Sequence, residues 1–537
     1  MGEKTVIQVS EAYPAAITGT KRRIIARAVL DLIDPDMTYG SVTSSGADAY
    51  SKSEQIHNKT FDGMAKTASL ELNRWVLDGT WDILPDNPSD AGGEYGFVGA
   101  ALSGDDCMFD MAQYVQLNVS NLSILQAAAV YFSDVPEDGI AVDFVFSVLS
   151  GATTAYEQTV TGNTERAVYF DGFEAHDVTA IRVTVTRWSL PGRRMRVAEI
   201  VPGVYEVWDG DTIYAVDVLR EFAPDNMTLP YSVANLTIYN KNKRFNPYAP
   251  NTILKSLEER QAIPISFGLE LPDGSVEYLP AGTYYQKNGG WDTSAYGATF
   301  DFSLVCLIGL LSKRDYRPPE PLPVTVQGWI ESILSHLGDK FTTRYQIDSG
   351  LADKALTASP ELINAVNCGT LLRYIAMAIQ AVCRTDIKTG NLLIEAMPDA
   401  SSGIELTLDN MRTYPTIRPS DRIASIKFTL ADNEEYVVAG DGSETDGDIT
   451  YNIKNPFVTT QAAADQAAAY IMRYHAGNLY TLQGRGDLRS ELTDIDTFAT
   501  GFGGTHTARR YKQQIHYSRG VVARAPSYLV DDTEVTS

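Results

Sequence analysis

The chain has 537 residues, too many for one hydrophobic core, because cores stop growing at roughly 250 to 300 residues. Its 44 basic and 68 acidic side chains give a net charge of −24, which repels phosphate backbones and anionic lipid and argues against a nucleic-acid partner. With 29 Tyr, 41 Gly and 24 Pro spread along the chain, the composition is typical of a β-rich protein of several domains with frequent turns.

The cysteines and the N-terminal residues indicate the cellular compartment in which the chain folds. Cys107, Cys306, Cys368 and Cys383 include no Cys-x-x-Cys pair, so we expect folding in a reducing cytoplasm without disulfides. Residues 1–20 lack the basic-then-apolar order of a signal peptide, and no stretch of about 18 uncharged apolar residues occurs. We therefore expect no membrane insertion, and export by a route such as lysis.

The first 60 residues read as strand, turn, strand and connection. Residues 5–9 and 24–32 are apolar and predict strands on either side of a turn at 19–21. Residues 38–59 are dominated by Ser, Thr, Gly and Asp, which is typical of an exposed connection.

A series of short alternating strands follows. Turn signals such as Pro136-Glu137-Asp138-Gly139 separate them. Strands at this spacing over about 140 residues predict a β-sandwich of the jelly-roll kind. The strands are expected at 115–119, 127–132, 140–148, 164–169 and 180–188.

Longer alternations resume after residue 205 and end at a proline-rich linker. Each proline of 318–323 fixes its own φ and constrains its predecessor, so this segment cannot be helical. We place a domain boundary at 316–323. Before it we expect strands at 235–240, 263–271 and 298–311, with one helix near 252–259.

Helices and strands mix beyond the linker. Helical spacing at 326–337 and 368–383, followed by a strand at 392–396, predicts an α/β part. An Ala-rich helix is expected from 460 to 474, with Thr459 or Thr460 as its cap and Gly477 beyond its end. The remaining strands are expected at 423–430, 435–439, 449–453 and 509–523, and the last dozen residues form a loose tail.

Two sets of segments carry a family resemblance. The first looks like the discoidin-like, galactose-binding-fold module found in tail proteins of phages and prophages of Gram-positive hosts. It comprises 67–80 (TASLELNRWVLDGT), 129–133 (AVYFS), 181–189 (IRVTVTRWS) and 194–203 (RMRVAEIVPG). The second resembles the first barrel of tail hub and tail-tip proteins of the same phages. It comprises 244–251 (RFNPYAPN), 264–270 (PISFGLE) and 282–285 (GTYY).

The resemblance implies a mainly β fold with an α/β part. It predicts two hub-type β-barrel domains, an α/β middle domain and an inserted β-sandwich, bracketed by about Ser69 and Gly203. Insertion into a barrel requires the sandwich's own ends to lie close together. One departure concerns the later hub domains: a Gly-x-Pro-x-Leu-Glu-like turn is expected after the Ala-rich helix, whereas this chain reads GDLRSE at 486–491. The domains are expected at 1–60 and 206–315 (barrel 1), 61–205 (sandwich), 316–400 (middle domain) and 401–537 (second barrel, with its helix at about 460–475).

The resemblance also implies assembly. Hub proteins form a threefold ring that closes the tail tube, so we expect a homotrimer at the tail tip of the virion, assembled in the cytoplasm of the host bacterium. The expected partners are the distal tail ring, the tape-measure protein and fibres, with host cell-wall polysaccharide as a further ligand of the sandwich.

No residue set for catalysis stands out. The sequence lacks His-Glu-x-x-His, Gly-x-Ser-x-Gly and Walker motifs, and its six histidines are scattered, so we expect no enzyme and no cofactor. The acidic loop 441–448 lacks the glycine that a calcium loop needs at its sixth position, which favours a solvated hairpin. A structural calcium ion would suit the sandwich, but nothing in the sequence selects among Asp105, Asp106 and Asp138.

Two smaller features have structural interpretations. The basic clusters 21–27 and 187–196 adjoin strand-like residues, which favours a solvated edge or ion pairs over polyanion binding. Cys368 and Cys383 share one apolar helical stretch, which favours packing in the core.

Sugar binding is the one site hypothesis. Sugars stack their apolar faces on exposed aromatic rings, and Trp81, Tyr95 and Phe97 lie in loop-like sequence of the sandwich. Trp75 and Trp188 lie in strand-like runs and are expected in the core. We therefore name Trp81, Tyr95 and Phe97 as candidate glycan-binding residues.

Two other functions remain open at this stage. A secreted carbohydrate-binding adhesin would have a signal peptide, which residues 1–20 do not provide. A tail-associated cell-wall hydrolase would need a separate catalytic domain, and only about 15 residues follow Val521.

Overall fold

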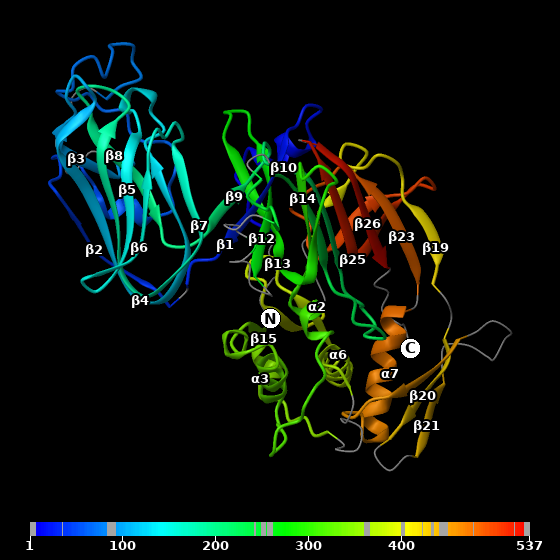
Figure 1. The fold of residues 1–537 in the computed structure, drawn as a ribbon. Coiled ribbons are helices and arrows are strands. Elements are labelled where there is room, and N and C mark those ends of the chain that lie inside the picture. Colours follow the sequence, from blue (N-terminus) through cyan, green and yellow to red (C-terminus); the bar gives the residue numbers. More distant parts are fainter. Residues whose placement is uncertain are drawn as a thin grey trace. The chain divides into compact units, whose positions relative to one another are not determined.

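The protein is described by a computed structural model that is mainly β, with an α/β part, as predicted (Figure 1). It divides into two compact units. The sandwich unit comprises Leu30–Glu206 and Asn242–Glu258, and the sheet unit comprises Met1–Val29, Val207–Lys241 and Glu259–Ser537. The described residues are 7–34, 36–82, 93–240, 243–248, 254, 261–358, 366–398, 403–420, 423–430, 434–439, 449–475, 477–519 and 521–530.

Seven strands build the sandwich unit. They follow the order β3-β8-β4-β7-β5-β6, with β2 paired to β4. Its core is aromatic: Phe132, Phe146, Phe170 and Trp188 are fully or almost fully buried, and the rings of Phe146 and Phe170 stack at 3.9 Å. The strands are β2 (Thr38–Ser44), β3 (Phe97–Leu102), β4 (Met108–Phe132), β5 (Ala141–Ser150), β6 (Thr153–Val160), β7 (Ala167–Trp188) and β8 (Arg194–Val201), with 3-10 turns at Ser53–His57 and Pro136–Asp138.

The predicted sandwich strands are present, but several are continuous. The strands expected at 115–119 and 127–132 are parts of β4, and those expected at 164–169 and 180–188 are parts of β7. The pairing of β4 with β7 contains register shifts, at which extra residues are accommodated without ending either strand. The prediction of an exposed connection at 38–59 is wrong, because this segment contains strand β2 and a 3-10 turn in which Ile56 is buried.

The two ends of the main segment of the sandwich unit lie side by side. Its first described strand, β2, precedes residue 61, and its ends meet where the Leu32 N–H donates to the Val204 carbonyl at 2.7 Å. Gly203 sits at φ +142°, and a Cβ there would lie 3.1 Å from Ile33 Cα, so the crossing of the two segments favours glycine. The main segment of this compact unit runs from Leu30 to Glu206, and an insertion bracketed by Ser69 and Gly203 stays a prediction.

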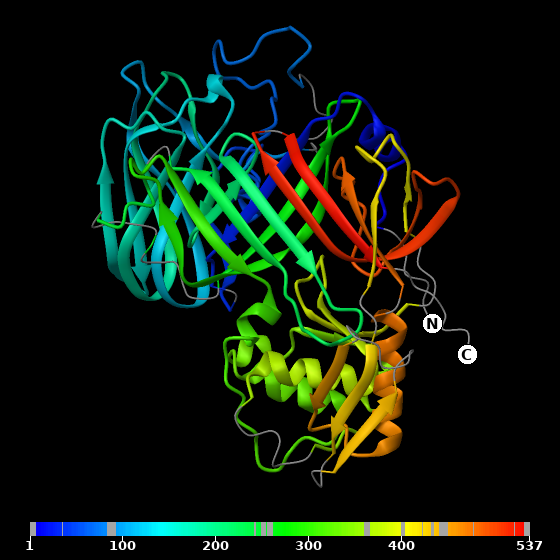
Figure 2. The ribbon, with the colours of Figure 1, turned by 90° about the vertical axis from the view of Figure 1, so that its right-hand side faces the viewer.

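The sheet unit is built on a 13-stranded sheet (Figure 2). Strand β10 pairs with both β11 and β25, so strands from the middle and the end of the chain share one sheet. Its main path is β19-β23-β26-β25-β10-β11-β14-β13-β12-β1-β9. The strands are β1 (Ile24–Asp31), β9 (Tyr205–Trp208), β10 (Ile213–Glu221), β11 (Val233–Tyr239), β12 (Ala262–Glu270), β13 (Val276–Thr293), β14 (Thr299–Val305), β18 (Glu405–Leu406), β19 (Thr416–Pro419), β23 (Asn478–Gly484), β24 (Ile495–Ala499), β25 (Thr505–Ser518) and β26 (Val521–Val530).

The α/β part contains two small sheets and most of the helices. The buried alanines of α7 pack on the sheet β21-β20-β22, and α6 leads into the sheet β15-β17-β16. The elements are α2 (Leu307–Leu311), α3 (Val326–Ser335), α4 (Ser349–Ala352), α6 (Cys368–Ile379), α7 (Gln461–His475), a 3-10 turn (Asp339–Phe341), β15 (Tyr345–Ile347), β16 (Ala381–Thr385), β17 (Leu392–Ala396), β20 (Ile423–Thr429), β21 (Glu435–Ala439) and β22 (Ile449–Lys454), whereas α1 (Tyr13–Thr18) lies against β12 of the large sheet.

Several element boundaries differ from expectation in this unit. The helix expected over 368–383 ends at Ile379, because Gln380 adopts a left-handed conformation and the β-branched segment after it forms β16. The strand expected at 298–311 ends at Val305, and α2 follows. The loose tail begins later than expected, since β26 extends to Val530.

Of the remaining predictions, some are confirmed, some are wrong and some lie outside the described residues. Thr460 accepts a hydrogen bond from the Ala463 N–H at the start of α7, as its capping role predicted. Helix α1 was not expected, and residues 7–9 form no strand. The helix near 252–259, apart from Leu254, and the acidic loop 441–448 lie outside the described residues. The predicted boundary at 316–323 falls inside the sheet unit, whose division into two barrels and a middle domain stays a prediction.

Candidate functional site

A pocket of about 560 Å³ opens on the sandwich unit. Its walls come from three segments without strand structure, 48–50, 64–75 and 94–95, and from the start of β8. Met64 and Leu70 make part of the wall apolar, and Tyr50, Trp75 and Tyr95 add aromatic rings. The volume lies within the range of pockets that hold small ligands.

Buried ion pairs form the base of this pocket. Arg196 pairs with Glu71 through both carboxylate oxygens, and Arg74 Nε lies 2.6 Å from Asp138 Oδ1. Ser133 Oγ donates to the other oxygen of Asp138 at 2.6 Å. Each charge therefore has a partner of opposite sign, as burial requires.

Glu71 remains ionised over most of the pH range. Burial alone would raise the pKa of its carboxyl, but the hydrogen bonds and charge of Arg196, with the Arg194 N–H, lower that pKa to about 2. A carboxyl with so low a pKa is a poor proton donor at neutral pH. The ion pairs at the base act as a scaffold for the pocket wall.

Two arginines and the indole of Trp75 itself hold the loop that carries Trp75. Arg74 Nη1 donates to the Thr67 carbonyl at 2.6 Å, and the Trp75 indole N–H donates to the Ser69 carbonyl at 2.9 Å. Arg193 reaches the Leu72 carbonyl at 2.9 Å. The loop therefore has a defined shape without belonging to a strand.

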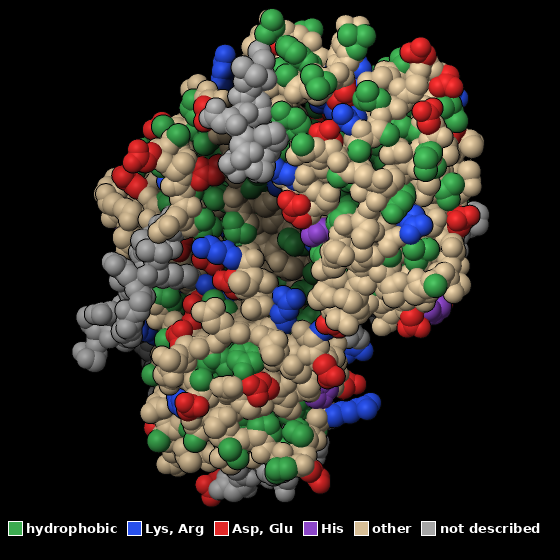
Figure 3. All heavy atoms as spheres, turned by 90° about the vertical axis from the view of Figure 1, so that its left-hand side faces the viewer, with side chains coloured by type: hydrophobic (Ala, Val, Ile, Leu, Met, Phe, Trp, Pro, Cys, Tyr) green, Lys and Arg blue, Asp and Glu red, His purple; other side chains and the backbone are tan. Residues whose placement is uncertain are grey.

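The basic cluster at 187–196 is thus largely internal. Arg193 and Arg196 are each 7 % exposed, and Arg194 Nη2 lies 3.3 Å from Asp48 Oδ2 at the pocket rim. Among the described side chains on the face drawn in Figure 3, Lys and Arg are interspersed with Asp and Glu and form no continuous basic patch. This arrangement agrees with ion pairing rather than polyanion binding.

The aromatic wall has the features of a sugar-binding surface. The rings of Tyr50 and Tyr95 lie 6.5 Å apart, and Lys52 Nζ lies 5.1 Å from the centre of the Tyr95 ring. Tyr50 and Trp75 are half-buried, so each ring keeps an exposed part. Asp48, Glu94 and Arg194 supply polar groups around these rings.

The three predicted glycan-binding residues are less exposed than expected. Their exposed fractions are 7 % for Trp81, 8 % for Tyr95 and 0 % for Phe97. Only Tyr95 lines the pocket, and its hydroxyl shares a hydrogen bond of 2.8 Å with Thr67. Trp81 packs in a small apolar cluster with Arg74 5.0 Å from its ring centre, and Phe97 belongs to the main core.

Sequence reasoning missed two pocket residues. Trp75 was expected in the core, because the apolar run around it resembles a strand, and Tyr50 lay in a supposed connection. The signal for Trp75 was the turn Asp78-Gly79 that follows at once and shortens any strand. Trp188, by contrast, is fully buried, as predicted.

The described residues hold no group of three or more His, Cys, Asp or Glu side chains placed to bind a metal ion. Within the same residues no helix is long and apolar enough to cross a membrane. Cys306, Cys368 and Cys383 are buried and unpaired, and burial raises the pKa of the Cys368 thiol to about 12. Cys368 and Cys383 thus pack in the core, although Cys383 does so from β16.

Comparison with known proteins gave matches among solved structures only. No family model matches the chain, and a search of curated proteins found no relative. The prophage MuSo2 43 kDa tail protein from Shewanella oneidensis aligns with 13 % identity over 61 % of this chain and 95 % of its own, with a TM-score of 0.41. A tail protein from Neisseria meningitidis aligns with 11 % identity over 62 % and 94 %, with a TM-score of 0.39. The prophage tail protein gp18 from Listeria monocytogenes aligns with 10 % identity over 63 % and 93 %, with a TM-score of 0.37. These three solved structures are all tail proteins, two of them from prophages.

Proposed function

We propose that this chain is a structural protein of a phage tail tip, a hub that closes the tail tube. The observation that carries the proposal is how the hub-like segments fold. Residues 264–270 lie in β12 and 282–285 in β13, and they pair directly, with Pro264 opposite Thr283 and Ile265 opposite Gly282. Two of the three hub-like segments thus form one local structure, whereas the described part of the third, 244–248, belongs to the sandwich unit.

The discoidin-like segments support the same proposal. Residues 129–132 of β4 pair with 197–201 of β8, and 181–185 of β7 pair with 113–117 of β4. A sandwich whose ends meet at one crossing can be carried by a hub without interrupting the main sheet.

The assembly that we propose is a homotrimer in the virion. It would contact the distal tail ring, the tape-measure protein and fibres, and it would be assembled in the cytoplasm of the host bacterium. Hosts of the Gram-positive type remain part of this proposal, because the motifs resemble proteins of their phages. The buried thiols fit folding in a reducing cytoplasm.

The test of the assembly is the mass of the purified full-length chain in solution, measured by mass photometry over a hundredfold range of concentration. The proposal predicts a closed species of three chains that persists on dilution. A chain that stays monomeric at all concentrations would contradict the trimer.

We further propose that the sandwich pocket contacts host cell-wall glycan. The support is its wall of Tyr50, Trp75 and Tyr95 beside Asp48 and Arg194. Tyr95 keeps its predicted role in this proposal, whereas Trp81 and Phe97 would act through packing.

The glycan test uses the full-length chain and purified wall polysaccharides in calorimetry. Trp75→Ala should weaken binding at least tenfold, because stacking on the indole is lost. Trp291→Ala is the matched control, since Trp291 is 39 % exposed and belongs to the sheet unit. Absence of binding by the unmodified chain would contradict the glycan proposal and leave the assembly proposal standing.

A further inference from the structure

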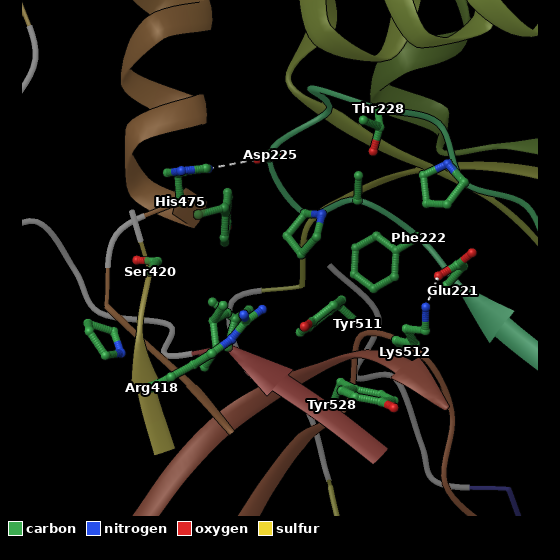
Figure 4. A pocket seen from close by; sticks show the side chains of 17 residues that line it. Glu221, Phe222, Asp225, Thr228, Arg418, Ser420, His475, Tyr511, Lys512 and Tyr528 are labelled. Carbon is green, nitrogen blue, oxygen red and sulfur yellow. Dashed lines mark hydrogen bonds and ion pairs between the residues drawn. The ribbon is translucent and has the colours of Figure 1, made fainter. Parts of the chain in front are cut away.

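A second pocket, of about 510 Å³, lies within the sheet unit (Figure 4). Its wall combines the loop that follows β10, the end of α7, the edge strand β19 and the strands β25 and β26. These segments are far apart in the sequence. The glycan proposal makes no use of this pocket.

Aromatic rings line much of its surface. Phe222 and Tyr474 are buried there, at 1 % and 5 % exposed, whereas Tyr511 and Tyr528 are half-buried (Figure 4). Pro224, Pro230 and Pro419 add rigid apolar surface. A groove of tyrosine and proline offers flat contacts for an extended peptide, whose backbone leaves its side chains free to enter.

The charges of the pocket are not all matched. Lys512 Nζ lies 2.8 Å from Glu221 Oε2, and His475 Nδ1 lies 3.1 Å from Asp225 Oδ2, so these groups form two pairs. Arg418 forms no ion pair with a described carboxylate. Figure 4 shows its side chain directed toward Tyr511, and its positive charge opposes the rise that burial causes in the pKa of the Tyr511 hydroxyl. Arg418 is thus the one cation of the pocket that has no ion pair with the residues that the structure describes, and it lies beside Tyr511.

The strand that carries Arg418 lies at the end of the sheet. Strand β19 pairs only with β23 among the described strands, and all four of its residues are exposed. Ile417 is 38 % exposed, and Tyr414 just before the strand is 45 % exposed. An unpaired edge with apolar side chains is a template for another strand. The edge is short, because Pro419 has no N–H to donate.

We propose that this pocket binds an extended segment of a partner protein that adds to the free edge of β19 and places an acidic side chain on Arg418. The edge supplies main-chain hydrogen bonds, the tyrosine and proline surface supplies area, and Arg418 selects the charge. The short edge alone would hold such a segment weakly, so both parts of the site are needed. The inference is independent of the tail-hub assembly proposed above.

The probes for the test are fluorescent heptapeptides of alternating Thr and Val whose central residue is Glu, Gln or Lys. Their binding to the full-length chain is measured by fluorescence anisotropy. The Glu peptide should bind most tightly and the Lys peptide least. Arg418→Glu should weaken the Glu peptide by about tenfold and reverse the order, because it removes an attraction and adds a repulsion. Arg418→Gln should remove the preference without reversing it.

A matched variant controls for the net charge of the chain. Lys313→Glu makes the same change of sign on an exposed side chain of the same unit that does not line the pocket, and it should leave the order unchanged. N-methylation of alternate peptide bonds tests strand addition. Methyl groups in one register should abolish binding, and those in the other should not, because only alternate N–H groups face a paired strand.

Three outcomes would overturn the proposal. The first is equal affinity for the Glu and Lys peptides, or no measurable binding of the Glu peptide at millimolar concentration. The second is a charge preference that Arg418→Glu leaves unchanged. The third is binding of soluble acidic oligosaccharides that Arg418→Glu abolishes while the peptides do not bind, which would assign the pocket to a sugar.

Discussion

Replacing Glu71 by Gln tests the ion pairs under the sandwich pocket. The pKa of this carboxyl is about 2 in the folded chain, against 4.5 for an unperturbed glutamate. Each pKa unit corresponds to about 1.4 kcal/mol, so ionised Glu71 contributes about 3 kcal/mol of stability to the sandwich unit. Removing its charge also leaves the buried Arg196 without its strongest ion-pair partner, which lowers the stability further.

The pH dependence gives this prediction its sign. A carboxyl whose pKa is lowered by folding stabilises the fold fully above its unfolded pKa and loses that contribution as the pH falls through its folded pKa. For Glu71 this window runs from pH 4.5 down to about 2. The Glu71→Gln variant should therefore be less stable than the unmodified chain at pH 7, and the two should converge near pH 2.

Hydrogen exchange read by mass spectrometry on the full-length chain measures this difference locally. Amides of β8 should show an opening free energy about 3 kcal/mol lower in Glu71→Gln at pH 7. Glu165→Gln is the control, because Glu165 is an exposed carboxylate of the same unit. A difference below 1 kcal/mol at pH 7, or one of equal size at pH 2, would refute the reasoning.

Three further predictions rest on other buried groups. Glu199 is fully buried, and burial raises the pKa of its carboxyl to about 8, so the free energy of unfolding falls as the pH rises from 4.5 to 8. At pH 9 the Glu199→Gln variant should be more stable than the unmodified chain by up to about 4 kcal/mol, and an unchanged thermal midpoint there would contradict this. The guanidinium of Arg244 lies 3.8 Å from the centre of the Tyr169 ring and pairs with Asp171. Arg244→Lys should therefore lower the free energy of unfolding by about 2 kcal/mol and speed amide exchange in β7. Unaltered exchange would argue against the stacked geometry. Cys107 alone is partly exposed among the four cysteines, so a thiol reagent should label one cysteine rapidly in the folded chain and the other three only after unfolding; rapid labelling of more than one would contradict the buried positions.

The sequence predicted strands best where alternation was long and turns were strong. Strands β11, β12 and β20 lie close to their expected positions, because each alternates buried and more exposed residues over most of its length. Strand β2 was missed, since Thr38, Ser41 and Thr43 are exposed and none of its residues is fully buried, so it has no stripe of buried apolar residues. The helix before Gln380 was predicted too long, because a left-handed cap at a glutamine leaves no mark in a periodic apolar pattern.

The candidate site was predicted in kind but not in detail. Aromatic residues of the sandwich do line a pocket, yet loop-like sequence was a poor guide to exposure. Phe97 begins a strand and enters the core, and Trp81 packs beneath Arg74. The contacts that decide these positions join Glu71 to Arg196 and Arg74 to Asp138 across long sequence separations. Spacing along the chain carries no information about such pairs.

The most direct test of the tail-tip role is immuno-electron microscopy of phage particles from a host that encodes the chain. Antibodies against the purified chain should label one end of the tail, and they should do so on intact particles. Unlabelled particles, with the chain recovered as free protein in the medium, would contradict the account and favour a secreted adhesin.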